Sequence, residues 1–206
     1  TNYYEVVPSN HLQRLLWAEA DRMVNLNVDD ANFASEREVV KEEYRQGILA
    51  PPYGKLFWLL DDLTFQKHPY KRGVIGNLEE LSAATREDAE KFYRTFYRPD
   101  NAVLIVAGDF DQAQLDKWVD QYFGSIKRPE DAIPRVAEVE PEWTTERRYN
   151  EFGPRVPFPA AALVYRAPRT TSPDIPALRV AALILSGGES SRLYNALVRE
   201  QEIAQQ

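Results

Sequence analysis

Residues 33–46 read FASEREVVKEEYRQ, and their spacing predicts a helix with an unusual face. Successive residues of an α-helix are about 100° apart, so the apolar residues of this stretch share one sector roughly 140° wide. They are Phe33, Val39, Val40 and Tyr44. Glu36 and Glu43 fall near the centre of the same sector, about 20° apart. Glu38 and Glu42 fall on the opposite side, where the charged residues of a surface helix belong.

Two carboxylates on a buried helical face require compensation, because an unpaired buried carboxylate is costly and tends to take up a proton. We therefore expect a metal ion, an arginine or several hydrogen-bond donors beside Glu36 and Glu43. Their spacing places the two side chains roughly 10 Å apart along the axis, so both can face one cleft without sharing a ligand. Helical phase alone leaves two structural alternatives open. Each carboxylate could meet a buried arginine, or the helix could be rotated so that both reach water.

The flanking sequence predicts further helices from capping residues and helical periodicity. Ser9 and Asn10 can cap a helix over residues 11–23. Asp29 and Asp30 can cap the helix that contains the two glutamates, which is expected to run to about residue 49, before Pro51 and Pro52 stop it. The other expected helices are 53–65, 78–81, 86–97 (capped by Thr85), 112–123, 175–185 and 190–204.

Four stretches rich in β-forming residues predict strands, at residues 3–7, 101–108, 147–152 and 160–166. The second is a continuous apolar run, typical of a strand buried on both faces. Helices and strands alternate without a strict βαβ order, which predicts an α+β fold. Between residues 127 and 143, three prolines stand among charged residues, and this composition indicates a linker.

Composition excludes several classes of function. The net charge of −7 offers no basic surface for nucleic acid. No apolar stretch approaches the roughly 18 residues of a membrane span. The absence of cysteine excludes disulfides, thiolate zinc ligands and a cysteine nucleophile. The two histidines, His11 and His68, are so placed that no Ser-His-Asp set can be argued.

Several motifs, in the same order along the chain, resemble those of the pitrilysin/insulinase-type (M16) zinc peptidases. EREVVKEE at residues 36–43 resembles that family's distal glutamate helix, and residues 1–23 resemble the stretch that follows its zinc-binding helix. The later landmarks are HPY at 68–70 with VIG at 74–76, FYRPDNAV at 96–103, GDF at 108–110 and GGESSRLY at 187–194. The resemblance extends over essentially the whole chain.

The resemblance implies a zinc site that is only partly present. In the family, two histidines of a His-x-x-Glu-His motif and a distal glutamate hold zinc, and the motif's glutamate activates water. By this resemblance Glu43 is the third zinc ligand, and Glu36 is the second active-site glutamate that supports catalysis. Neither His11 nor His68 lies in such a motif, so the two histidine ligands are expected upstream. The chain alone is therefore expected to be inactive as a peptidase and to bind zinc weakly.

The same resemblance implies an M16-like fold with a mixed or antiparallel sheet flanked by helices, truncated at both ends. Residues 1–127 would be the rear of a first domain, 128–142 a linker, and 143–206 the front of a second, non-catalytic domain. The whole protein would be a metalloendopeptidase acting on peptides, with a second M16-like subunit or a homodimer as its assembly and a periplasmic or secreted location. The alternative is a non-catalytic partner or scaffold subunit of the same fold.

Overall fold

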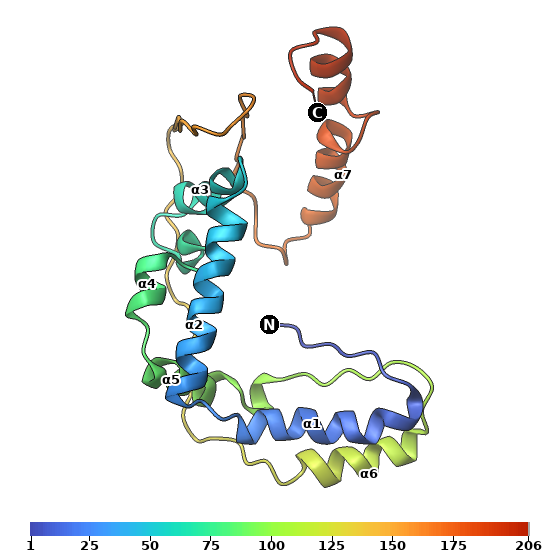
Figure 1. The fold of residues 1–206 in the computed structure, drawn as a ribbon. Helices are drawn as coiled ribbons and strands as arrows, with labels where there is room; N and C mark the ends of the chain where they lie inside the picture. The colour runs from blue at the N-terminus through green and yellow to red at the C-terminus, as the bar shows by residue number, and fades with distance from the viewer. Residues whose placement is uncertain (206) are drawn as a thin grey trace. The chain divides into compact units, whose positions relative to one another are not determined.

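The computed structural model describes residues 1–205, which form helices joined by extended segments (Figure 1). The chain divides into two compact units, residues 1–142 with 148–159, and residues 143–147 with the chain from Ala160 onward. The first unit contains η1 (Ser9–His11), α1 (Leu12–Asn25), α2 (Asp30–Tyr44), η2 (Arg45–Leu49), α3 (Gly54–Thr64), η3 (Pro69–Arg72), α4 (Leu78–Ala83), α5 (Arg86–Phe96), η4 (Pro99–Asn101) and α6 (Gln112–Phe123). The second contains α7 (Ile175–Ser186) and η5 (Tyr194–Glu200).

The α+β prediction is wrong, because residues 1–205 contain helices and no strand. The four expected strands, and with them the mixed or antiparallel sheet, are absent from this described part of the chain. Residues 102–106 show the reason. Ala102 has extended torsions (φ −120°, ψ 149°), yet Val103 and Ile105 are 86% and 81% exposed. A β-former adopts a strand only when a neighbouring segment completes its hydrogen-bond ladder.

Most of the predicted helices are present, because their starting signals are local, but the helix expected over 190–204 is represented mainly by the π-helical segment η5, and residues 201–204 are not helical. Asp29 caps α2 by accepting a hydrogen bond from the backbone N–H of Asn32 at 2.7 Å. At the start of α5, Thr85 and Asp88 form a reciprocal capping box. The helix expected over 30–49 is α2 continued by the π-helical turn η2. Such caps satisfy the first backbone N–H groups of a helix, which have no partner within it.

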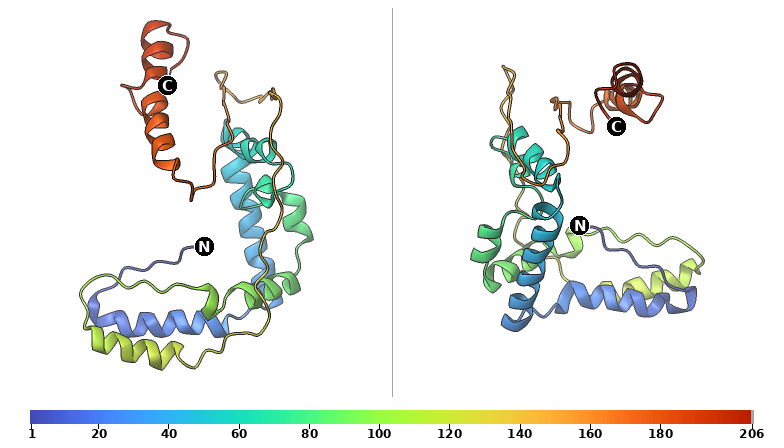
Figure 2. Two further views of the ribbon diagram at one scale, coloured as in Figure 1. Left: turned by 180° about the vertical axis from the view of Figure 1, so that it is seen from behind. Right: turned by 45° about the horizontal axis from the view of Figure 1, so that its top comes forward.

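The buried core of the first unit lies between α1 and α6, which run side by side (Figure 1 and Figure 2). Leu12 and Leu16 of α1 and Leu115 of α6 are buried together. Partly buried apolar residues surround them: Val106, Phe110, Trp118, Val119, Tyr122 and Phe123. Helix α2 packs instead against α4 and α5, on a separate side of the same unit.

The proline-containing segment after α6 is held against the first unit near both of its ends. Near the start, the buried Arg98 guanidinium donates hydrogen bonds to the carbonyls of Pro129 and Asp131, each at 2.8 Å. At the far end, the Glu140 carboxylate accepts three consecutive backbone N–H groups, from residues 66, 67 and 68, at 2.5, 2.9 and 2.8 Å. We call residues 129–140 the strap.

Glu140→Gln is expected to loosen the far end of the strap. A neutral amide has one accepting oxygen where the carboxylate has two, so it cannot reproduce three charge-assisted hydrogen bonds. Hydrogen exchange of the amides of residues 66–68 should become about tenfold faster, the effect of losing one such bond. Glu138→Gln, at an exposed position of the same segment, is the matched control. Unchanged exchange in Glu140→Gln would show that the carboxylate does not hold this loop.

The second unit ends α7 with a glycine turn. Gly187 donates its N–H to the carbonyl of Leu183 at 2.8 Å, and Gly188 has a positive φ of 78°, a conformation that favours glycine. Beyond the turn, the buried Ser191 accepts a hydrogen bond from the N–H of Tyr194, the first residue of η5. Helix α7 contains no histidine, and its apolar side chains are exposed, with Leu183 at 65%. We therefore assign the turn a structural role.

Candidate functional site

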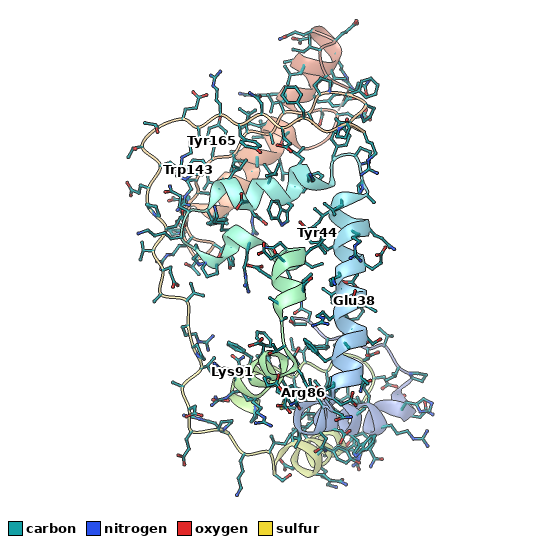
Figure 3. The ribbon with its side chains drawn as sticks, turned by 60° about the vertical axis from the view of Figure 1, so that its left-hand side comes forward. Glu38, Tyr44, Arg86, Lys91, Trp143 and Tyr165 are labelled. Carbon is teal, nitrogen blue, oxygen red and sulfur yellow. The ribbon has the colours of Figure 1, made fainter. Side chains whose placement is uncertain are left out.

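Helix α2 carries the two candidate site residues, and its neighbours determine which side it exposes. Phe33, Val40 and Lys41 are half-buried and Tyr44 is buried. Helix α2 packs against α4 and α5, and Figure 3 shows Tyr44 near the end of α2. Glu36, Val39 and Glu43 are exposed, with Val39 at 48%. We call these three residues the glutamate face of α2.

The prediction that Glu36 and Glu43 are buried is wrong for residues 1–205. The apolar sector of α2 is wider than the surface that covers it, so only the Phe33, Val40 and Tyr44 edge is packed. The Val39 edge stays open, together with both glutamates. Of the two structural alternatives, no buried arginine meets either carboxylate in the described chain, and the rotation that lets both reach water is what the structure has.

The four glutamates of α2 fall into two pairs with different surroundings. Glu38 pairs with Lys41 at 3.0 Å, and this contact lowers its pKa. The pKa of Glu42 is lowered by hydrogen bonds from Gln46 and Arg45. Glu36 and Glu43, in contrast, have no hydrogen-bond or ion-pair partner among residues 1–205. The glutamate face thus offers two exposed carboxylates that the fold does not otherwise use.

The two histidines lie apart from this face in local structural roles. His11 ends η1 and is exposed. His68 caps η3, where its Nδ1 accepts the backbone N–H of Tyr70 at 3.2 Å and its ring packs on Tyr70 with centroids 4.3 Å apart. Within the described part of the chain, no three metal-ligating side chains of the His, Cys, Asp or Glu type come together. The residues present can supply carboxylate ligands from α2 but do not complete a metal site.

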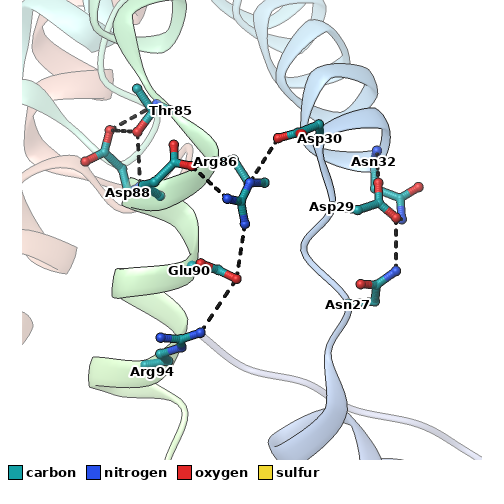
Figure 4. Close-up of polar contacts among 10 residues, drawn as sticks. Asn27, Asp29, Asp30, Asn32, Thr85, Arg86, Asp88, Glu90 and Arg94 are labelled. Atoms are coloured by element: carbon teal, nitrogen blue, oxygen red, sulfur yellow. Dashed lines mark hydrogen bonds and ion pairs between the residues drawn. The ribbon is translucent and has the colours of Figure 1, made fainter.

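Arg37 and Arg86 are site neighbours that the sequence reasoning missed. Arg37 donates to the carbonyl of Ala84 at 3.2 Å, at the corner between α4 and α5. Arg86 forms an ion pair with Asp30 at 2.9 Å (Figure 4). Both contacts join α2 to that corner. Arginines spaced along an acidic helix and at the start of another are common surface residues, so no signal in the sequence singled them out.

Comparison with known proteins identifies the family of this chain. A family profile described as "Peptidase M16 inactive domain" matches residues 83–206, more than half of the chain. The chain belongs to the M16 peptidase family. The M16 relatives include a zinc protease, PqqE, of Helicobacter pylori (strain ATCC 700392 / 26695), which is 30% identical over 207 residues, covering 100% of this chain and 47% of the relative.

Other proteins similar to this chain carry names that describe different roles. Human mitochondrial cytochrome b-c1 complex subunit 1 is 27% identical over 187 residues, covering 90% of this chain and 38% of the relative. A solved structure, titled the crystal structure of a protease from Helicobacter pylori, superposes with a TM-score of 0.82 at 27% identity, covering 97% of this chain and 49% of that one. The chain thus spans about half the length, or less, of these M16 proteins.

Among residues 1–205, no helix has the length and apolar character needed to cross a membrane.

Proposed function

We propose that this chain is part of a zinc metalloendopeptidase and carries its distal glutamate ligand, Glu43, and its supporting glutamate, Glu36. The observation that supports this most directly is the EREVVKEE motif at residues 36–43, which resembles the family's distal glutamate helix, and the exposure of Glu36 and Glu43 leaves both carboxylates accessible to a ligand. Family membership adds to it, since M16 relatives are named zinc proteases.

The proposal gives each of the two glutamates of the face a distinct task. Glu43 would donate a carboxylate oxygen to zinc, and Glu36 would orient a ligand or the attacking water by accepting its hydrogen bond. Bound zinc with an open coordination position polarises a carbonyl and lowers the pKa of water. The two histidine ligands and the catalytic base would come from a segment outside residues 1–206. Peptides would be the substrates.

The domain arrangement is part of the same proposal. Residues 1–127 would belong to the glutamate-bearing domain, 128–142 would connect it, and 143–206 would open a second domain without catalytic residues. The absence of histidine from α7 supports the non-catalytic assignment of the second domain. A second M16-like subunit or a homodimer would complete the assembly. This part of the proposal draws on relatives named as a subunit of the b-c1 complex and of mitochondrial-processing peptidase.

This chain alone is expected to show no peptidase activity and to bind zinc weakly. A carboxylate ligand without paired histidines leaves most of the coordination shell to water. Isothermal titration with zinc, and digestion of an unstructured protein substrate, should be run on the chain and on the whole protein in parallel. Stoichiometric tight binding by the chain would contradict the proposed division of ligands. Absence of zinc from the whole protein would contradict the proposed activity.

A non-catalytic partner or scaffold subunit is the second candidate. Two observations favour it: the matched profile describes an inactive domain, and one relative is named as a subunit of the b-c1 complex. The resemblance of residues 36–43 to the family's distal glutamate helix favours the catalytic proposal, whereas exposed glutamates by themselves are ordinary surface residues. Zinc content of the whole protein separates the two candidates, since a scaffold would carry none.

A further inference from the structure

We propose that Arg37 and Arg86 position the glutamate face of α2, by fastening a different side of that helix to the corner between α4 and α5. The inference rests on the proposed function of Glu36 and Glu43, because it concerns the orientation in which α2 presents them. Both arginines act through α2 and not on a ligand, so they are positioning residues.

Arg37 makes the attachment in the middle of α2. Its Nη1 donates to the carbonyl of Ala84 at 3.2 Å, and its guanidinium lies over the ring of Phe33 at 5.5 Å from the centroid. The side chain is 31% exposed. Ala84 is the residue between α4 and the capping residue of α5, so this hydrogen bond joins α2 to the corner itself.

Arg86 makes the second attachment, at the start of α2. Its Nε lies 2.9 Å from the Asp30 carboxylate, and its other nitrogens pair with Glu87 at 2.7 Å and Glu90 at 3.2 Å (Figure 4). These carboxylates raise the pKa of Arg86. An isolated exposed ion pair contributes little, but a branched set of pairs fixes the guanidinium in one orientation. Asp30 is the first residue of α2 and Arg86 the first of α5, so the pair joins two helix ends.

The corner that receives both attachments is itself held in place. Thr85 and Asp88 exchange hydrogen bonds in the capping box, at 3.0 Å and 3.2 Å through their backbone N–H groups. Thr85 lies between Ala84 and Arg86, the two residues that contact α2. A change in either contact is therefore transmitted to α2 and is not absorbed by a flexible turn.

The spacing of the attachments fixes the rotation of α2. Asp30 and Arg37 are one heptad apart, which places them about 20° apart around the axis and roughly 10 Å apart along it. Glu36 and Glu43 have the same spacing and lie about 120° around the helix from the first pair. Two attachments along one side define both the tilt and the rotation of the axis. The glutamate face is consequently held in a single orientation.

The test uses the whole protein and its affinity for Zn²⁺ and Co²⁺. Arg37→Met and Arg86→Met are expected to weaken binding of either metal by roughly two- to fivefold, because each removes a partly exposed contact that holds the helix and neither touches a ligand. The visible spectrum of the Co²⁺ form should change, because it reports ligand geometry. kcat should fall with KM nearly unchanged, and Arg37→Lys, which keeps a donor for Ala84, should recover part of the affinity.

Two further variants complete the test, one as a control and one as a second change at the Arg86 contact. Arg45→Met is the matched control, since Arg45 follows α2 directly and pairs only with Glu42 among the described ion pairs. Asp30→Asn removes the charge that attracts Arg86 from a side chain that is 92% exposed, so folding is not at risk, and it should weaken metal binding in the same direction. Wild-type affinity and an unchanged Co²⁺ spectrum in folded Asp30→Asn and Arg37→Met would overturn this inference. A wild-type protein that binds neither metal would instead overturn the proposed function.

Discussion

Glu43→Gln in the whole protein is expected to weaken zinc binding by more than about 100-fold and to reduce peptidase activity to a similar extent. Disturbing an outer partner of a metal ligand costs about 10- to 100-fold, and removing the charge of a ligand costs more. The amide has nearly the same size as the carboxylate, and Glu43 is exposed, so the fold should not change. Competition with a chromogenic zinc chelator gives the affinity, and hydrolysis of a fluorogenic peptide gives the activity.

Glu42→Gln is the control for this experiment. Glu42 is the next residue along the same helix, and it is already engaged by Arg45 and Gln46. Its substitution should leave zinc affinity and activity within about twofold of the wild type, an effect expected of an ordinary surface change. Glu36→Gln should reduce activity more than zinc affinity, since its proposed task is orientation. Equal behaviour of Glu42→Gln and Glu43→Gln would refute the assignment of Glu43.

Arg98→Ala is expected to produce the largest loss of stability in the first unit, about 3 kcal/mol in the free energy of unfolding. Hydrogen bonds to charged groups contribute about 1.5–3 kcal/mol each, and Arg98 donates two of them to the strap carbonyls of Pro129 and Asp131. At 4% exposure, Arg98 leaves little room for water to replace it. Urea unfolding followed by circular dichroism measures the loss.

Arg128→Ala is the matched comparison. Arg98 and Arg128 both pair with the Asp100 carboxylate, at 2.6 and 3.5 Å, but Arg128 is 74% exposed. Arg128→Ala should leave the unfolding midpoint nearly unchanged. Arg98 also lowers the pKa of Asp100 from its ordinary value of 3.8. That contribution to stability is present above pH 3.8 and is lost as the pH falls through the lowered pKa. Equal stability of the two variants at pH 7 would show that the strap contacts of Arg98 contribute nothing.

The helices could be predicted from the sequence because their signals lie within a few residues. Asp29, Thr85 and Asp111 each cap a helix by accepting a backbone N–H three residues ahead. The absence of the four expected strands from residues 1–205 could not be predicted, because strand formation depends on a neighbouring segment that lies far away in the sequence or outside it. Residues 101–108 have the composition of a buried strand, but Asn101 ends η4 and residues 102–108 belong to no helix or strand in the described chain.

The candidate site was predicted in part. The helix that carries Glu36 and Glu43 was predicted, but the burial of the two glutamates was not, since both are exposed. Helical phase could not say which edge of the wide apolar sector would be covered, because that depends on where α4 and α5 pack. The attachments of Arg37, Arg98 and Glu140 were missed for a related reason. Their partners are backbone groups 31 to 74 residues away. Every residue has such groups, so the sequence does not show which of them a side chain will contact.

The way the strap is fastened has a consequence for how this part of the chain can vary. Its attachments use backbone carbonyls at one end and a single carboxylate at the other, so residues 132–139 carry no side chain on which the fastening depends. Substitutions of residues 132–139 should therefore be tolerated, and foreign residues can be inserted among them. Doubling the length of a flexible loop costs only about 0.6 kcal/mol of closure entropy. An affinity tag or a protease recognition sequence placed there would report on the first unit while leaving its helices as they are.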